Sequence, residues 1–350
     1  MINTFQEYFE GLKTLSVESK KTLSDYLDEA GRKFLSLFNE LAPSLFVHIR
    51  LGKMYTGGEE KKNEFARRLF FLVGEINETG KLYETGNYVD SIPKMHRIIF
   101  NESNQLRPGF TPYLISRNSY WYRMRSAEKY EVYKKEGLYL ISDDKLELVA
   151  TQRFNGEGWP VLYLASSLYC AWEEVRRADI SQVNFAAFKA QRIIPVLDIA
   201  PPSQIIAIGS FIRAYFSIIC SCEVTEDKIA HKWQYVVSNL LMNTVRYHID
   251  HAGKQPSVFG IHYLSSKWSH ADEYQLEPSG IMDAVVLPAS ERLHASFLMT
   301  DPRTLFFYHA RHIGYWNPDI AYTSEYKSTI FFALEEQLKR EKFFSVEIND

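Results

Sequence analysis

Three side chains in the stretch Thr151–Val175 could take part in chemistry together: Arg153, Tyr163 and Glu174. They supply a guanidinium for anionic groups, a phenol and a carboxylate. Arg153 comes just before the turn signal Asn155-Gly156, so its guanidinium is expected at the rim of a sheet. Taken singly, Arg153 is more simply a surface residue, and Tyr163, in the middle of an apolar run, is more simply a core residue with a satisfied hydroxyl.

The helix expected after this strand carries two adjacent carboxylates, Glu173 and Glu174. Neighbouring helical residues point about 100° apart, so only one of them can face a cleft. Glu173 has Arg176 and Arg177 three and four residues on, which predicts a solvated ion pair. Glu174 lies on the side of Ala171, although Arg177 could also reach it, and an inward carboxylate there would be costly unless a function retains it. A surface ion pair is the simpler explanation of either glutamate taken alone.

Motifs of several familiar enzyme classes are absent from the sequence, which has no Walker loop, no Gly-x-Ser-x-Gly and no His-Glu-x-x-His. Gly156-x-Gly158 runs into a strand, whereas a dinucleotide-binding fingerprint needs a helix there. His248 and His251 are explained as polar residues of an exposed helix face. Arg246 and His251 match the Arg-x4-His spacing of HEPN ribonucleases, but this short pattern arises often by chance, and the chain lacks a basic surface for RNA.

Two kinds of secondary structure are expected to position these residues. Residues 1–115 carry apolar stripes at three- and four-residue spacing, which predict helices, and Thr22, with Asp25 three residues on, is a plausible helix start. From about Tyr120 the pattern changes to short β-rich runs separated by turn signals. Strands are expected at 138–141, 160–164, 192–197 and 284–288, and helices at 167–177, 232–250 and 328–342. Strands and helices in this irregular order predict an α+β fold with largely antiparallel strands.

Composition excludes several classes of protein. The 350 residues suffice for two domains or for one large domain with an extension, and 46% hydrophobic with 24% charged residues excludes general disorder. A net charge of −3 gives no field for nucleic acid or for an anionic membrane. Cys170, Cys220 and Cys222 form neither a disulfide framework nor a zinc motif, which favours a reducing compartment. Without a signal-peptide pattern or an unbroken apolar run of ~20 residues, the chain is expected to be soluble and cytoplasmic.

The spacing within Thr151–Val175 resembles the core of the RES-domain family. That core reads Arg-aromatic, then Gly and Pro, then Tyr-x-Ala ten residues after the Arg, then Ala-x-x-Glu-hydrophobic. Tyr163 follows Arg153 by ten residues, and Glu174 follows it by twenty-one. The other matching positions are Gly158, Pro160, Ala165, Ala171 and Val175.

Flanking segments extend the resemblance over roughly half of the chain, from about residue 121 to residue 288. Trp121–Arg125 resembles the opening strand of the family, and Asp283–Pro288 resembles its closing strand. Gly260–Ser265 resembles its Gly-Ile-Arg-Tyr-Pro-Ser strand, which nominates Ser265 as the serine of the family's name.

The chain departs from the family pattern in two places. Leu264 replaces the usual proline, which leaves the choice between Ser265 and Ser266 open. Asn239 stands where the family commonly has a glutamine, and on that basis it is a candidate substrate-binding residue.

The resemblance implies a fold similar to bacterial ADP-ribosyltransferase toxins, with NAD as a consumed substrate, no cofactor and no metal. Glu174 would stabilise the positive charge of an oxocarbenium-like ribose and hold a ribose hydroxyl. Arg153 and Arg123 would bind the phosphates of NAD. Tyr163 would position the nicotinamide end, and Ser265 would add a polar contact from a neighbouring strand.

The implied organisation is a helical domain over residues 1–115, a RES domain over 116–300 and a C-terminal extension over 301–350 that ends in a helix. The implied activity is cleavage of the nicotinamide–ribose bond of NAD by water or phosphate, in a bacterial toxin or defence effector. Transfer of ADP-ribose to a protein is the alternative within the same site, and a non-catalytic scaffold or interaction protein is the alternative of another class. An antitoxin protein is an implied partner, and the helical domain could cover the active site, form a homo-oligomer or sense a signal. The sequence leaves these points open.

Overall fold

The computed structural model describes most of the chain, which divides into two compact units. The described residues are 2–13, 22–49, 57–141, 143–202, 204–222, 232–253, 255–265, 280–290, 296–305, 308, 326 and 329–345. The first unit contains residues 1–112, 152–154 and 197–259. The second contains residues 113–151, 155–196 and 260–350. The unit with the N-terminal helices thus also includes residues 152–154 and 197–259, which were expected within the RES domain.

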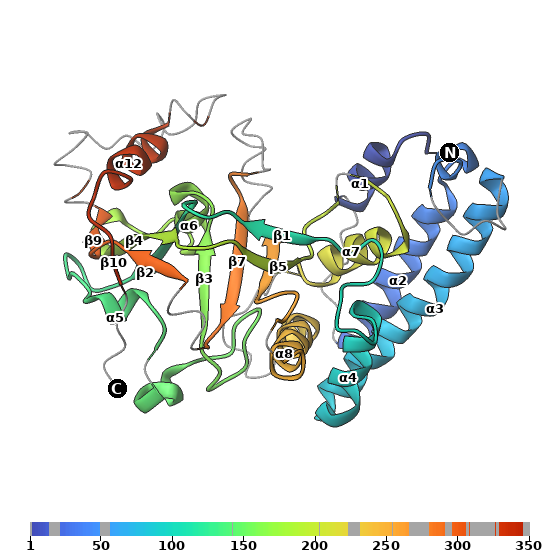
Figure 1. Cartoon of the computed structure of the whole chain (residues 1–350), viewed down its shortest axis with the longest axis horizontal. Helices are drawn as coiled ribbons and strands as arrows, with labels where there is room; N and C mark the ends of the chain where they lie inside the picture. The colour runs from blue at the N-terminus through green and yellow to red at the C-terminus, as the bar shows by residue number, and fades with distance from the viewer. Residues whose placement is uncertain are drawn as a thin grey trace. The chain divides into compact units, whose positions relative to one another are not determined.

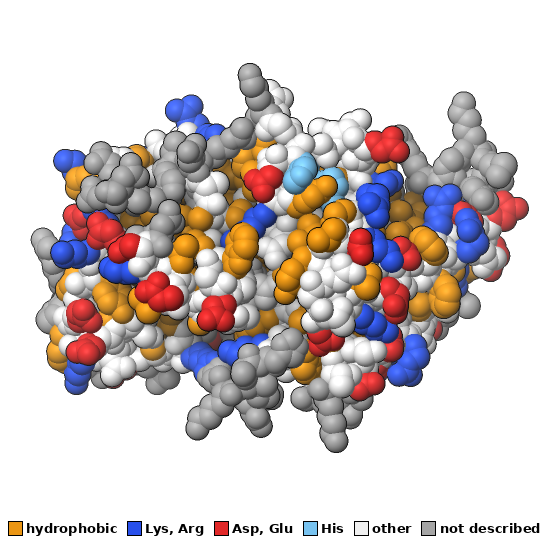
Figure 2. Space-filling model, turned by 90° about the horizontal axis from the view of Figure 1, so that it is seen from below, with side chains coloured by type: hydrophobic (Ala, Val, Ile, Leu, Met, Phe, Trp, Pro, Cys, Tyr) orange, Lys and Arg blue, Asp and Glu red, His pale blue; other side chains and the backbone are white. Residues whose placement is uncertain are grey.

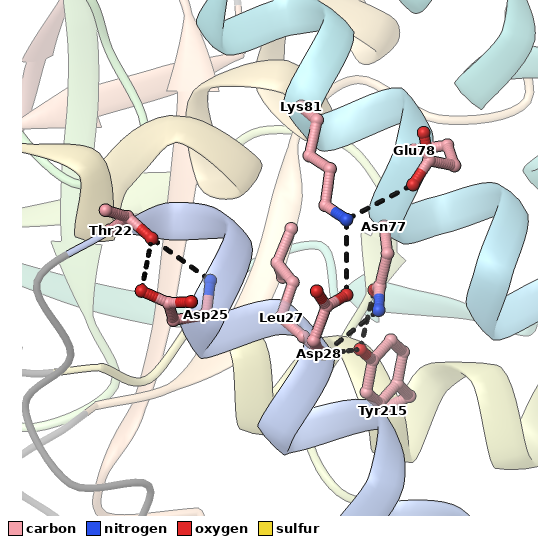
Figure 3. Close-up of polar contacts among 8 residues, drawn as sticks. All are labelled: Thr22, Asp25, Leu27, Asp28, Asn77, Glu78, Lys81 and Tyr215. Carbon is pink, nitrogen blue, oxygen red and sulfur yellow. Dashed lines mark hydrogen bonds and ion pairs between the residues drawn. The ribbon is translucent and has the colours of Figure 1, made fainter.

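The first unit is built from helices (Figure 1). They are α1 (Phe5–Lys13), α2 (Leu23–Asn39), η1 (Pro43–Phe46), α3 (Gly58–Glu84), α4 (Tyr88–Ile99), α7 (Ile208–Ile219), η4 (Trp233–Tyr235) and α8 (Val236–His251). The predicted start of α2 is confirmed, because Oγ1 of Thr22 accepts a hydrogen bond from the N–H of Asp25 (3.1 Å; Figure 3). The helix expected over 232–250 is also present, as η4 followed by α8.

Aromatic rings and one buried amide hold helices of the first unit together. The ring of Phe211 in α7 packs edge-on against that of Phe38 in α2, with their centroids 5.0 Å apart. Figure 3 shows Asn77 of α3, whose Nδ2 donates to the carbonyl of Leu27 in α2 (2.9 Å) and whose Oδ1 accepts from the hydroxyl of Tyr215 in α7 (2.7 Å). One face of α3 is therefore committed to α2 and α7.

The second unit contains most of a largely antiparallel sheet with flanking helices. The strands are β1 (Pro112–Ile115), β2 (Tyr120–Ser126), β3 (Val161–Ala165), β4 (Val183–Ala190), β5 (Ile194–Asp198), β6 (Ile261–Leu264), β7 (Asp283–Pro288), β8 (Phe297–Met299), β9 (Arg303–Thr304) and β10 (Phe344–Ser345). Their order is β1-β5-β6-β7-β3-β2-β4-β8-β10, with β9 pairing with β4. The helices are α5 (Lys135–Leu138), η2 (Asp143–Leu148), α6 (Leu168–Glu174), η3 (Ile180–Gln182) and α12 (Ile330–Leu338). β3 pairs antiparallel with both β2 and β7, and β6 pairs antiparallel with β7, so the predicted α+β class with largely antiparallel strands is confirmed.

Several predicted elements lie where they were expected, and one does not. Strands β3, β5 and β7 and helix α12 confirm the local patterns. The strand expected over 138–141 is wrong, because α5 ends at Leu138 and no strand follows there. Instead, the carbonyl of Tyr139 accepts a hydrogen bond from Nη1 of Arg123 (3.0 Å), and the side chains of residues 138–140 are buried. A short apolar run thus predicts burial without determining the backbone conformation.

His248, expected on an exposed helix face, is fully buried in the first unit. Its Nδ1 lies 3.3 Å from Nε2 of His96, and its ring stacks on Phe100 with the centroids 3.9 Å apart. The N–H of Ser257 donates to its Nε2 (3.0 Å). Burial, and then the charge of His96, lowers the pKa of His248 to about 4, so the ring is neutral in the folded protein at pH 7. His251 is exposed, as expected.

The surface carries a mixture of side-chain types. Figure 2 shows one face of the molecule, on which acidic and basic side chains are interspersed with hydrophobic ones, in keeping with the net charge of −3. None of the helices in the described part of the chain combines the length and the apolar character needed to cross a bilayer.

Candidate active site

Helix α6 follows β3 and carries Glu174 as its last residue. Ser167 caps the helix, because its Oγ accepts a hydrogen bond from the N–H of Cys170 (2.9 Å). The N–H of Leu168 donates to Oε1 of Glu335 in α12 (2.7 Å). The first N–H groups of a helix have no partner within it, so a serine and a carboxylate here satisfy groups that burial would otherwise penalise. These contacts fix the helix that carries the candidate carboxylate.

Ser265 and Glu174, 91 residues apart in the chain, are in direct contact. Ser265 comes directly after β6, is fully buried, and its N–H donates to the carbonyl of Met282 (3.0 Å). Its Oγ donates a hydrogen bond to Oε1 of Glu174 (2.5 Å), although Glu174 itself is an exposed residue. A carboxylate held at one oxygen and exposed to solvent can stabilise positive charge that develops on a bound molecule. Ser266, the alternative serine, lies outside the described residues.

Glu173 was expected to be solvated, and this expectation is wrong. Its Oε1 does pair with Nε of Arg177 (2.9 Å), but only 1% of the residue is exposed. Every residue of α6 from Leu168 to Glu173 is buried, and the helix ends where Arg176 and Arg177 have φ angles of 58° and 52° and the N–H of Arg177 bonds to the carbonyl of Trp172 (3.0 Å). The chain turns back there instead of continuing as a helix. Burial of the two glutamates is therefore the reverse of what a regular helix predicts: Glu173 is buried and Glu174 is exposed.

Tyr163 and Arg123 lie on neighbouring strands of the sheet, β3 and β2. The hydroxyl of the half-buried Tyr163 donates to Oδ1 of the buried Asn155 (3.0 Å). Burial, and then the charge of Arg125, lowers the pKa of Arg123 to about 9, and the interaction with Tyr163 acts in the opposite direction. Arg123 therefore remains a cation at pH 7, close enough to Tyr163 for the two to interact electrostatically.

Arg153 and Asn239 belong to the first unit. Arg153 is half-buried, and the carbonyl of its neighbour Gln152 accepts a hydrogen bond from Nδ2 of Asn239 in α8 (3.3 Å). The Oδ1 of Asn239 is buried and has no hydrogen-bond partner among the described residues. Because an unpaired buried oxygen is costly, this atom is a candidate acceptor for a bound molecule. The predicted site residues thus form one group in the first unit, Arg153 with Asn239, and another in the second unit around Glu174 and Ser265.

Three residues in or beside α6 were not singled out from the sequence. Cys170 in α6 is fully buried, and burial, followed by the charge of Glu174, raises the pKa of its thiol. Glu335 and Tyr326 also belong to the second unit, and the Tyr326 hydroxyl donates to Oε1 of Glu335 (2.5 Å). Burial raises the pKa of Glu335 to about 7. The sequence does contain a signal that could have identified Glu335 as a buried carboxyl. Glu335 comes four residues after Phe331, which places it on the apolar face of its helix.

Within the described part of the chain, His, Cys, Asp and Glu form no group of three or more placed to hold a metal ion. His262 of β6 and Asp283 of β7 come together as a pair, with Nε2 and Oδ1 3.4 Å apart, and His262 stacks on Tyr113 with centroids 3.8 Å apart. A pair alone falls short of the three or four protein ligands of a typical zinc site.

Comparison with known proteins gives one distant similarity. No family model matches the chain, and no solved structure matches it. The chain is 28% identical over 166 residues to a protein of Bacillus subtilis (strain 168) named "Putative toxin YopC". The matched part covers 42% of this chain and 36% of that protein, so the chain spans little more than a third of its relative's length. The chain is therefore distantly similar to a protein named as a toxin.

Proposed function

We propose that this protein is an NAD-consuming enzyme of the RES type that acts as a bacterial toxin or defence effector. The observation that carries the proposal is the hydrogen bond between Ser265 and Glu174, two residues that the RES pattern nominates from separate segments. The similarity to a protein named as a toxin supports the biological role. In the proposed reaction the bond between nicotinamide and ribose breaks, and nicotinamide leaves with the bonding electrons. Water adds to the ribose carbon and loses a proton, which gives ADP-ribose.

Glu174 would act at the ribose. Breaking the bond leaves an oxocarbenium-like ribose with positive charge, and a nearby carboxylate stabilises that charge more strongly than it stabilises the substrate. The hydrogen bond from Ser265 holds Oε1, so Oε2 would accept a hydrogen bond from a ribose hydroxyl. The stabilisation is then built into the site before the reaction begins.

The other site residues would bind the substrate. Arg123 and Arg153 would contact the phosphates of NAD, because a guanidinium forms two parallel hydrogen bonds with such groups. Tyr163 would position the nicotinamide end, and Oδ1 of Asn239 would accept a hydrogen bond from the substrate. These assignments rest on the RES spacing in the sequence.

Nicotinamide release from NAD by the purified full chain tests the proposal. Glu174→Gln keeps the shape of the side chain and removes its charge, so turnover is expected to fall on the order of 10²–10³-fold. Glu173→Gln is the matched control and is expected to retain turnover, because Glu173 is buried in an ion pair with Arg177. In cells, expression of the parent should deplete NAD, and expression of Glu174→Gln should not.

The acceptor is determined from the products of the same reaction. Free ADP-ribose indicates water, its phosphorylated form in phosphate buffer indicates phosphate, and label from NAD on a protein indicates ADP-ribosyl transfer. An antitoxin would be sought as a co-purifying protein that abolishes NAD loss. If the folded parent neither releases nicotinamide nor depletes cellular NAD, the proposal is wrong and a non-catalytic role is favoured.

A further inference from the structure

Helix α3 (Gly58–Glu84) exposes one long face to solvent, and two adjacent phenylalanines lie on it. Phe70 is 71% exposed and Phe71 is 65% exposed. The exposed residues of the helix recur at three- and four-residue steps, which places them on one face. They include Asn63, Arg67, Phe70, Phe71, Gly74 and Glu78. Two large aromatic side chains together on a solvent-facing helix mark a contact surface for another molecule.

Gly74 also lies on this exposed face, three residues after Phe71, and has no evident role within the chain. It is helical, and a Cβ added there would meet nothing within 4 Å. Glycine weakens the middle of a helix relative to alanine, so its presence needs another explanation. A glycine beside Phe71 creates a shallow place where a second helix can come close to the α3 backbone.

One cation and one anion of the same face lie symmetrically about a point within it. Arg67 and Glu78 are equally far along the sequence from the point between residues 72 and 73. Phe71 and Gly74 are also equally far from that point. Two antiparallel α3 helices related by a two-fold axis at this point would place Arg67 level with Glu78 of the second copy. Phe71 would then lie level with Gly74 of the second copy. Each Phe71 ring would face a Gly74 and each Arg67 a Glu78, while each Phe70 would lie level with Glu75.

We propose that the exposed face of α3 binds the α3 helix of a second copy of this chain, antiparallel and across a two-fold axis. The second copy is favoured because the face is complementary to itself in both shape and charge, as a two-fold interface requires. Arg67 and Glu78 each have a partner within the helix, Glu64 (2.8 Å) and Lys81 (3.2 Å), and keep exposed side chains that can reach a second copy. The inference concerns the first unit and does not depend on the proposed activity.

A single pair of helices makes a small interface. From Asn63 to Glu78 the face is about 22 Å long, at 1.5 Å per residue. Interfaces of this size are weak and transient, so a dissociation constant on the order of 10 µM is expected.

Sedimentation of the full chain tests the proposal over a range from about 1 to about 200 µM, which brackets the expected constant. Gly74→Leu is the most specific variant. The monomer has space for a leucine at position 74, but in the dimer this side chain would clash with Phe71 of the second copy. The variant is expected to weaken dimerisation at least 10-fold while leaving the chain folded. Phe71→Ser should do the same. Val89→Ser, at an 84% exposed position of α4, is the control and should leave the dimer unchanged.

Charge reversal distinguishes this pairing from other contacts of the same face. Arg67→Glu and Glu78→Arg should each weaken the dimer, and the double variant should restore it. A parent chain that stays monomeric up to the highest concentration overturns the proposal. So does a dimer that survives both Gly74→Leu and Phe71→Ser.

Discussion

The hydroxyl of the fully buried Ser265 donates a hydrogen bond to a carboxylate oxygen of the exposed Glu174, with 2.5 Å between Oγ and Oε1. The contact joins the end of strand β6 to the end of helix α6. Burial and the charge of Glu174 itself raise the pKa of the neighbouring Cys170, so the thiol stays neutral at pH 7. Glu174 therefore carries its negative charge without a thiolate beside it, and Ser265 limits the rotation of its side chain.

Ser265→Ala is expected to lower nicotinamide release about 10-fold or more, because one hydrogen bond to a charged group contributes about 1.5–3 kcal/mol. The effect should fall on kcat more than on KM, since the hydrogen bond orients Glu174 and does not bind NAD. Ser166→Ala is the matched control, because Ser166 donates instead to the carbonyl of Ile281 (3.1 Å). Equal kcat values for Ser265→Ala and the parent would show that this contact has no role in turnover.

Arg153→Lys is expected to weaken NAD binding although the charge is kept, because a lysine cannot form the two parallel hydrogen bonds of a guanidinium. Binding should be measured by calorimetry in the Glu174→Gln background, so that NAD is not consumed during the titration. Arg97→Lys, at an exposed position in the last turn of α4, is the control. Unchanged affinity in Arg153→Lys would show that Arg153 does not bind the phosphates of NAD.

Glu173→Gln is expected to lower the free energy of unfolding by about 1–3 kcal/mol, because it replaces the ion pair between the buried Glu173 carboxylate and the partly exposed Arg177 with a neutral hydrogen bond. Glu174→Gln should change stability less than Glu173→Gln does, because the position is exposed and the amide oxygen can still accept the hydrogen bond from Ser265. Urea denaturation of both variants measures this difference. The opposite ranking would mean that the burial of the two glutamates is reversed in solution.

Local patterns in the sequence predicted local features of the fold. Thr22 and Asp25 predicted the start of α2, since a cap depends only on neighbouring residues. The apolar runs at β3 and β7 predicted strands, and the irregular order of strands and helices predicted the α+β class. The RES spacing also named Ser265 and Glu174, which the structure brings into contact.

Features that depend on distant parts of the chain could not be predicted. Glu173 is buried because the whole of α6 from Leu168 to Glu173 is covered by the elements packed around it, which the local sequence does not report. The burial of His248 follows from its packing against His96 and Phe100, some 150 residues earlier. Periodicity reports which face of a helix is apolar, and it does not report which partner covers a polar residue.

Glu335 is expected to make stability depend on pH. Burial raises the pKa of its carboxyl to about 7, above the ordinary value of 4.5. Below pH 4.5 the carboxyl is protonated in both the folded and the unfolded chain, and it has no effect. Between pH 4.5 and 7 the unfolded chain releases the proton while the folded chain keeps it, so stability falls as the pH rises. Above pH 7 both states are ionised and the loss is complete.

Glu335→Gln tests this prediction, because the amide keeps an oxygen that can accept from the N–H of Leu168 and the hydroxyl of Tyr326. Relative to the parent, the variant should gain up to about 3 kcal/mol of stability between pH 4.5 and 7.5, at 1.36 kcal/mol per pKa unit. Glu336→Gln, whose parent residue pairs with Lys339 and is only half-buried, should show no such gain. Urea denaturation across this pH range measures both. If Glu335→Gln and the parent lose stability in parallel as the pH rises, folding does not shift the pKa of Glu335, and above its ordinary value of 4.5 α6 is held by a carboxylate.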